Sequence, residues 1–132
     1  MDTRLREFLK LIPEPAKEFA VSAAANPLRE KSELAAEIEN YVHRIDEVAR
    51  RKHDLDVNLS EAIAQTCLTL LDEDWDRVGE IDKKLIQIGC CYFIDEGDAE
   101  GDLESVFGFD DDAELLNAVL DLIARPELKI IV

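Results

Sequence analysis

The sequence has few cysteines, only two histidines and no CxxC spacing. Its three cysteines, Cys67, Cys90 and Cys91, are an odd number, and His43 and His53 are distant from them in the sequence. A disulfide framework and a structural zinc site are therefore not expected. Apolar and then acidic residues surround the adjacent pair, so the three thiols are predicted to be ordinary buried, reduced side chains.

The chain also lacks an apolar run long enough to span a bilayer, and its first 15 residues lack the continuous apolar stretch of a signal peptide. We therefore expect a cytoplasmic protein. Motifs that would indicate an enzyme class are missing as well, because no nucleophile elbow, phosphate-binding loop or dinucleotide-binding glycine pattern occurs. The sequence predicts no catalytic residue.

Basic residues are scarce, since 15 Lys and Arg oppose 31 Asp and Glu for a formal net charge of −16. Residues 1–71 have a balance of −3, and residues 72–132 have a balance of −13. Phosphate groups and anionic lipids are bound by clustered Lys and Arg, so neither nucleic acid nor a membrane is an expected partner. A basic protein surface or divalent cations are the natural counterparts of such a charge.

Apolar residues are plentiful and recur with the period of a helix. They make up 47% of the 132 residues, enough for one domain over residues 1–132 with its own core. The clearest apolar stripe joins residues at alternating spacings of four and three: Leu34, Ile38, Tyr41, Ile45 and Val48. An exposed part of this stripe could serve a homodimer, although packing inside the chain would use the same residues.

The fold class predicted from these patterns is an all-α single-domain bundle of about six helices, packed around the third, fifth and last helices. Pro13, Pro27 and Pro126 are expected to interrupt helices. Ser32, Asn58 and Asp111 are the predicted N-caps of the third, fourth and last helices. The predicted helices run over residues 5–12, 15–25, 33–52, 59–71, 78–94 and 112–125.

Three local features add to this prediction. The fifth helix is apolar on nearly all sides from Leu85 to Ile94, so it is expected at the centre, and Gly89 is expected to mark a close contact between helices. The fourth helix is expected to stop at the acidic stretch 72–74, with Trp75 anchoring the turn. Residues 128–132 have the composition of a strand but no partner strand, which favours an extended tail.

An acidic loop is predicted between the last two helices, over residues 95–112. Its aspartates Asp98, Asp102, Asp111 and Asp112 are the oxygen ligands that Ca²⁺ or Mg²⁺ would use. An EF-hand is excluded, because the twelfth position counted from Asp98 is Phe109 and not glutamate. In the alternative interpretation Asp111 caps the last helix, while Asp98 and Asp102 bind backbone N–H groups of the loop.

The same region carries a resemblance to a known family. An apolar helix ends in Tyr92-Phe93-Ile94, aspartates follow at 98 and 102, and Gly108-Phe109-Asp110-Asp111-Asp112-Ala113 leads into another apolar helix. Residues 85–123 thereby resemble the YkvA-like family of small bacterial helical domains of unknown function. The resemblance implies a helical fold and a bacterial source, and it implies no enzymatic activity.

Two functions of different classes are expected from the sequence. The first is a non-enzymatic interaction or regulatory domain of a bacterial cytosol that binds a basic protein partner. Its surface would be the acidic loop, and the loop residues expected to organise it are Asp98, Asp102, Gly108, Phe109, Asp111 and Asp112. The second is a divalent-cation-binding protein, either a sensor or a metal-dependent enzyme, that uses Asp98, Asp102, Asp111 and Asp112 for Ca²⁺ or Mg²⁺. No other cofactor is expected.

Overall fold

Helices form the whole regular structure of the computed structural model, which describes residues 2–51, 56–95 and 109–131. The six α-helices of these ranges are α1 (Thr3–Leu11), α2 (Glu14–Ala24), α3 (Lys31–Ala49), α4 (Val57–Thr69), α5 (Glu80–Asp95) and α7 (Asp110–Leu122). Shorter elements are the π-helix η1 (Leu70–Asp74) and the 3₁₀ turns η2 (Trp75–Arg77) and η4 (Pro126–Leu128). The predicted all-α class is confirmed. In these ranges no helix combines the length and apolarity needed to cross a bilayer.

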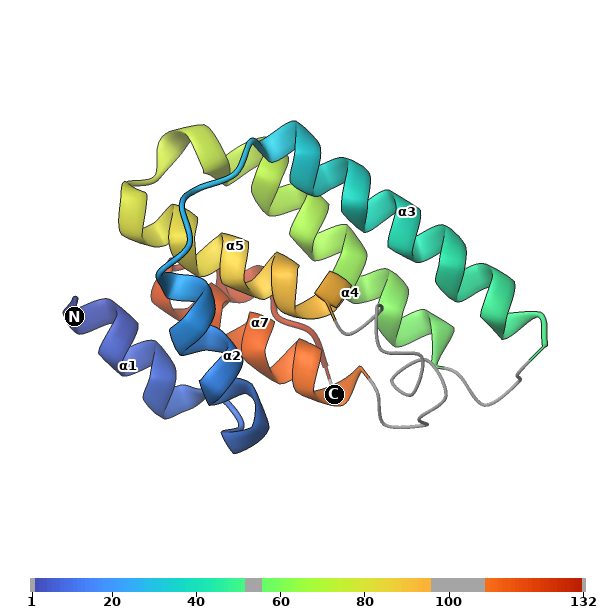
Figure 1. Cartoon of the computed structure of the whole chain (residues 1–132), viewed down its shortest axis with the longest axis horizontal. Coiled ribbons are helices and arrows are strands. Elements are labelled where there is room, and N and C mark those ends of the chain that lie inside the picture. The colour runs from blue at the N-terminus through green and yellow to red at the C-terminus, as the bar shows by residue number, and fades with distance from the viewer. Residues whose placement is uncertain (1, 52–55, 96–108, 132) are drawn as a thin grey trace.

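The central element is α5, as the sequence predicts. It contacts α1, α2, α3, α4 and α7, while α3 and α4 pack side by side along their length (Figure 1). Residues from every face of α5 are buried, including Leu85, Ile86, Ile88 and Phe93. A helix that is apolar on all sides lowers the free energy of folding only when other helices surround it, which explains this position.

The predicted stripe of α3 is confirmed as core. Leu34, Ile38, Tyr41 and Ile45 are at most 3% exposed, and Val48 is half-buried. The Tyr41 ring meets the Phe93 ring of α5 edge-on, with the ring centroids 4.8 Å apart. Packing inside the chain thus uses this stripe.

Gly89 marks the closest approach of α5 to α7. A Cβ atom placed on Gly89 would lie 3.0 Å from Leu116 Cδ1 and 3.6 Å from Val119 Cγ2. Both of these neighbours are fully buried. The expectation that Gly89 allows a close contact between helices is therefore confirmed.

The helix starts correct two predicted caps. Asp56, and not Asn58, caps α4, because its carboxylate accepts a hydrogen bond from Leu59 N at 3.0 Å. The N-cap of α3 is Glu30, so Ser32 already lies inside the helix. An aspartate two residues earlier competes directly with asparagine for the same free N–H groups, and the sequence alone does not rank the two.

The fourth α-helix ends at Thr69, before the predicted acidic stretch, and helical structure of other types continues to Arg77, which corrects that prediction. The backbone widens into η1 and then tightens into η2, so that Leu70, Leu71, Asp74 and Trp75 are all buried. A π-turn places one extra residue in a helical turn, which changes the side chains that face the core in the residues after it. The predicted anchoring role of Trp75 agrees with its 6% exposure.

The chain leaves α7 earlier than Pro126 predicts. The helix ends at Leu122, and Ala124 has a φ of 63°, the left-handed conformation common after a helix. Beyond η4 the tail is extended, as expected. Asn117 holds it, because its Oδ1 accepts from Ile130 N at 2.7 Å and its Nδ2 donates to Ile130 O at 2.8 Å.

Candidate functional site

The acidic loop predicted as the functional surface falls largely outside the described residues. Asp98, Asp102 and Gly108 are not among them, whereas Phe109, Asp111 and Asp112 are. The proposed roles of the first three residues therefore stay predictions.

The described end of this region is the start of α7. Phe109 is 3% exposed, occupies the N-cap position and lies 6.2 Å from the Phe93 ring, measured between centroids. Its side chain anchors the helix start in the core. The prediction that Asp111 is the N-cap of the last helix is wrong, because the helix already begins at Asp110 and no side chain caps it.

Three consecutive aspartates occupy the first turn of α7. Asp112 is 2% exposed, while Asp110 and Asp111 are half-buried. Negative charge at a helix N-terminus interacts favourably with the helix dipole, so this placement stabilises α7. Consecutive helical residues point in directions about 100° apart. Within the described ranges no three His, Cys, Asp or Glu side chains come together as a metal site.

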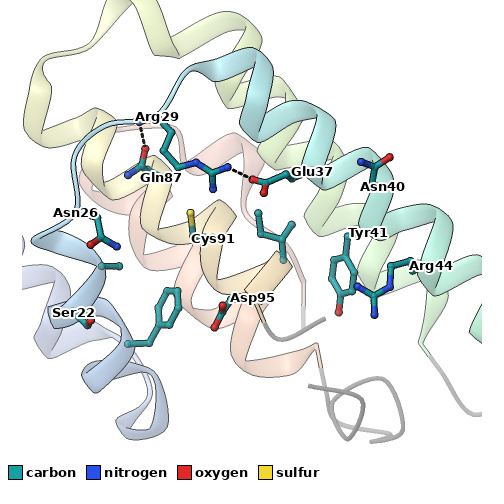
Figure 2. A pocket seen from close by; sticks show the side chains of 13 residues that line it. Ser22, Asn26, Arg29, Glu37, Asn40, Tyr41, Arg44, Gln87, Cys91 and Asp95 are labelled. Carbon is teal, nitrogen blue, oxygen red and sulfur yellow. Dashed lines mark hydrogen bonds and ion pairs between the residues drawn. The ribbon is translucent and has the colours of Figure 1, made fainter. Parts of the chain in front are cut away.

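A cavity that the sequence did not predict lies between α2, α3 and α5 (Figure 2). Its volume is about 400 Å³. Both charged and apolar side chains line it. The α2 side and the segment after α2 contribute Phe19, Ser22, Ala23, Asn26 and Arg29; α3 contributes Glu37, Asn40, Tyr41 and Arg44; α5 contributes Gln87, Cys91, Ile94 and Asp95.

Gln87 fixes one wall of this cavity. Its Oε1 accepts a hydrogen bond from Arg29 N at 2.8 Å, and its Nε2 donates to Pro27 O at 3.0 Å. The side chain is only 5% exposed, so both ends of a buried amide are satisfied. Through these two bonds α5 holds the segment that connects α2 to α3.

Arg29 forms the upper wall in Figure 2, where it pairs with Glu37. Its Nε also donates to Glu33 Oε1 at 3.0 Å. Burial opposes the positive charge, but the hydrogen bonds to Glu33 and Glu37 outweigh it and raise the pKa of Arg29. The guanidinium is therefore a permanent, fixed cation whose charge two carboxylates offset.

Cys91 lies at the centre of the cavity (Figure 2). Burial, followed by the neighbouring Cys90, raises the pKa of this thiol to about 11. The thiol is thus protonated at neutral pH and is a poor nucleophile. Cys67 and Cys90 are buried, as predicted, whereas Cys91 is only half-buried; all three cysteines are free. The hydrogen bond with Cys67 and complete burial raise the pKa of Cys90 well above its usual value.

Aromatic rings support the other walls. Phe19 of α2 meets Tyr92 of α5 edge-on, with centroids 5.3 Å apart, and Tyr41 is fixed against Phe93. Such pairs restrict ring rotation and add about 1 kcal/mol each beyond their buried area. Phe19 and Tyr41 are consequently held in place by packing.

One signal of this cavity is present in the sequence. Gln87 is the only polar side chain in the apolar run LIQIGCCYFI, and a buried amide needs partners. Those partners, Pro27 and Arg29, are about 60 residues earlier in the chain. No local pattern identifies them.

Comparisons of the chain with protein-family models, with curated proteins and with solved structures find no match. The resemblance of residues 85–123 to the YkvA-like family stays a prediction.

Proposed function

We propose that this chain is a non-enzymatic interaction domain that binds a basic protein partner through its acidic surface. The supporting observation is the position of its carboxylates. Acidic residues outnumber Lys and Arg by 31 to 15, and Asp74 and Asp112 are the only charged side chains buried in the described ranges. Even complete pairing inside the chain would leave a surplus of carboxylates facing solvent.

Six basic residues of the described part form ion pairs with carboxylates. Ion pairs join Arg4 to Asp82, Lys17 to Glu14, Arg29 to Glu33 and Glu37, Lys31 to Asp76, Arg125 to Glu73, Asp74 and Glu127, and Lys129 to Asp121. A site for phosphate or anionic lipid needs clustered cations that are available to the ligand. These pairs reduce the number of cations that an anionic partner could bind, which supports a cationic partner.

The turn between α4 and α5 exposes four carboxylates, and we call it the acidic turn: Asp72, Glu73, Asp76 and Glu80. Lys31 and Arg125 offset Asp76 and Glu73. Asp72 and Glu80 take part in no ion pair among the described residues. Exposed like charges accelerate the encounter with a protein of opposite charge, and salt weakens this effect.

The experiment is affinity capture from a bacterial lysate at low ionic strength, with release by increasing NaCl, followed by titration of the purified partner. We expect a partner of net positive charge whose affinity and association rate both fall as salt rises. A captured protein of net negative charge, or an affinity that is independent of salt, would contradict the proposal.

Charge-neutralising variants then locate the contact. Asp72→Asn/Glu80→Gln tests the acidic turn, and Asp98→Asn/Asp102→Asn tests the predicted loop. Glu7→Gln/Glu18→Gln removes the same charge from exposed positions of α1 and α2 and serves as the control. A local contact lowers the association rate several-fold in one of the first two variants only. Equal losses in all three would show that overall charge, and no particular surface, attracts the partner.

A further inference from the structure

The extended tail over residues 129–131 has one paired and one open backbone edge. The amide of Asn117 binds both the N–H and the carbonyl of Ile130, at 2.7 and 2.8 Å, as a neighbouring strand would. The N–H of Ile131 and the carbonyl of Lys129 form no hydrogen bond with any other described residue. Peptide groups of adjacent residues in extended backbone point to different sides, so these two groups face away from Asn117.

A groove of about 620 Å³ lies beside this open edge. Leu59 and Ala62 of α4 line it together with residues 128–131. Asn117 is not among the lining residues, so the groove lies on the side of the tail that its amide leaves open. A row of unpaired backbone groups beside a groove is the arrangement to which an extended peptide adds as a further strand.

The tail also presents apolar side chains in this groove. Ile131 is 96% exposed, and Leu128 and Ile130 are half-buried beside it. A β-branched residue is favoured in strands, where a cross-strand neighbour covers it. An apolar side chain of a bound segment would therefore shield Ile131 from water.

The charge of the groove favours a cationic segment. Asp56 and Asp110 line it, and neither forms an ion pair with another described residue. The positive ends of α4 and α7 offset only about half of each carboxylate charge. Lys129 also lines the groove, but its ammonium group is paired with Asp121 at 3.1 Å. Asp110 belongs to the predicted acidic loop, so the groove lies at the described end of that surface.

We propose that an extended segment of the basic partner binds in this groove as a strand paired with residues 129–131. Its backbone binds the N–H of Ile131 and the carbonyl of Lys129, and one of its apolar side chains covers Ile131. A Lys or Arg of the segment lies toward Asp56 and Asp110. The inference rests on the proposed function, because it names the part of the basic partner that is bound. A second copy of this chain fits less well, since it carries the same net charge of −16.

The test uses synthetic peptides, and it needs no natural partner. The first peptide alternates lysine and valine over about seven residues. Three others each lack one feature: methylation of the backbone nitrogens removes the N–H donors, glutamate in place of lysine reverses the charge, and serine in place of valine removes the apolar groups. Fluorescence anisotropy at fixed ionic strength measures binding. We expect saturable binding of the first peptide and about tenfold weaker binding, or none, of the others.

Two substitutions of one residue test the backbone contact. Ile131→Pro removes the N–H that the segment would bind, and proline is compatible with an extended residue before it. Ile131→Val keeps this N–H and serves as the matched control. Ile131 is 96% exposed, so we expect both variants to fold. The affinity for the lysine–valine peptide should fall about threefold to tenfold in Ile131→Pro and stay within about twofold in Ile131→Val.

A second pair of variants tests the charge contact. Asp56→Asn/Asp110→Asn should weaken the peptide and reduce the dependence of its affinity on salt, because two carboxylates of the groove are neutralised. Asparagine is as good an N-cap as aspartate, so the start of α4 is preserved. Glu7→Gln/Glu18→Gln removes the same charge from exposed positions outside the groove and should have a smaller effect.

The outcomes separate this inference from the proposed function. If no peptide binds, if the methylated peptide binds as tightly as the first, or if both charge variants weaken binding equally, the groove is not the site. A basic partner captured in a salt-dependent manner would then still support the proposed function. Equal binding of the lysine and glutamate peptides contradicts both. A dimer in sedimentation that Ile131→Pro dissociates would identify a second copy as the occupant and overturn the inference.

Discussion

Arg125 and Asp74 form an ion pair that joins segments 51 residues apart in the sequence. Asp74 ends the π-helix η1 and has a side chain that is 8% exposed, while Arg125 follows α7 and is 22% exposed. Arg125 also binds Glu127 at 2.6 Å and approaches Glu73 to 3.5 Å. This one guanidinium therefore connects the irregular end of α4 to the C-terminal segment.

Replacing Arg125 should destabilise the fold strongly. We expect Arg125→Leu to lower the free energy of unfolding by about 2–4 kcal/mol, because the carboxylate of Asp74 stays buried without its cation. Adding Asp74→Leu should recover a large part of the loss. Urea unfolding measures both. Lys129→Met is the control, since the Lys129–Asp121 pair is exposed and should contribute less than about 1 kcal/mol. Equal losses of unfolding free energy in Arg125→Leu and Lys129→Met would show that the buried pair stabilises the fold no more than the exposed pair does.

Gly89 should not tolerate a side chain. Gly89→Ala gains about 1 kcal/mol of helix propensity but forces the Leu116 side chain to move, which typically costs about 1–3 kcal/mol in a packed core. We expect a net loss of stability of roughly 1 kcal/mol, measured by urea unfolding. Gly79→Ala is the comparison, because nothing lies within 4 Å of a Cβ there. A stabilised Gly89→Ala protein would mean that α5 and α7 separate easily.

Cys91 should react slowly with thiol reagents in the folded protein. A pKa of about 11 in place of 9.0 leaves roughly a hundredfold less thiolate at pH 8. We therefore expect the reaction of Cys91 with a disulfide reagent to be slow at pH 8 and to accelerate as the pH approaches 11. Urea-unfolded protein, in which all three thiols have ordinary pKa values, is the reference. A folded Cys91 that reacts as fast as the unfolded reference contradicts the burial.

The same pKa makes stability depend on pH. Folding raises the pKa of Cys91, so between about pH 9 and 11 the unfolded chain binds fewer protons than the folded chain. Stability is then fully present below pH 9 and declines as the pH rises toward 11. The decline should be smaller in Cys91→Ala, which lacks the contribution of this thiol. Identical pH profiles of the two proteins, measured by thermal unfolding, would argue against the shift.

Divalent cations separate the two functions expected from the sequence. A specific site saturated at about 1,000 times its Kd would add roughly 4 kcal/mol to the free energy of unfolding. If the chain is an interaction domain, Ca²⁺ and Mg²⁺ should only reproduce the effect of NaCl at matched ionic strength. A saturable shift with one cation that Asp98→Asn/Asp111→Asn abolishes would establish the metal site and set the interaction proposal aside.

Periodicity made the helices predictable, because burial of a stripe is a local property of the sequence. The stripes of α3 and α5 were identified in this way, together with the role of Gly89. Helix ends were less predictable. Asp56 and Asn58 compete for the same N–H groups. Asp74, the last residue of the π-helix Leu70–Asp74, pairs with Arg125, which is distant in sequence.

The candidate site was not predictable for a different reason. The cavity exists only because α2, α3 and α5 meet, and its organising residues Gln87 and Arg29 are 58 positions apart. The acidic loop was the predicted site because its aspartates are close in sequence. Closeness in sequence is a poor guide to which side chains share a cavity in a helical bundle.

Gln87 binds backbone atoms and no side chains, since its partners are the N–H of Arg29 and the carbonyl of Pro27. Both hydrogen bonds can therefore form with any residue at position 28. At position 29 they exclude only proline, which has no backbone N–H. Position 87, in contrast, needs a side chain with one donor and one acceptor that is long enough to reach both backbone atoms. A saturation mutagenesis of the chain would thus find an unequal tolerance across this contact, with the connecting segment permissive and the glutamine on α5 nearly invariant.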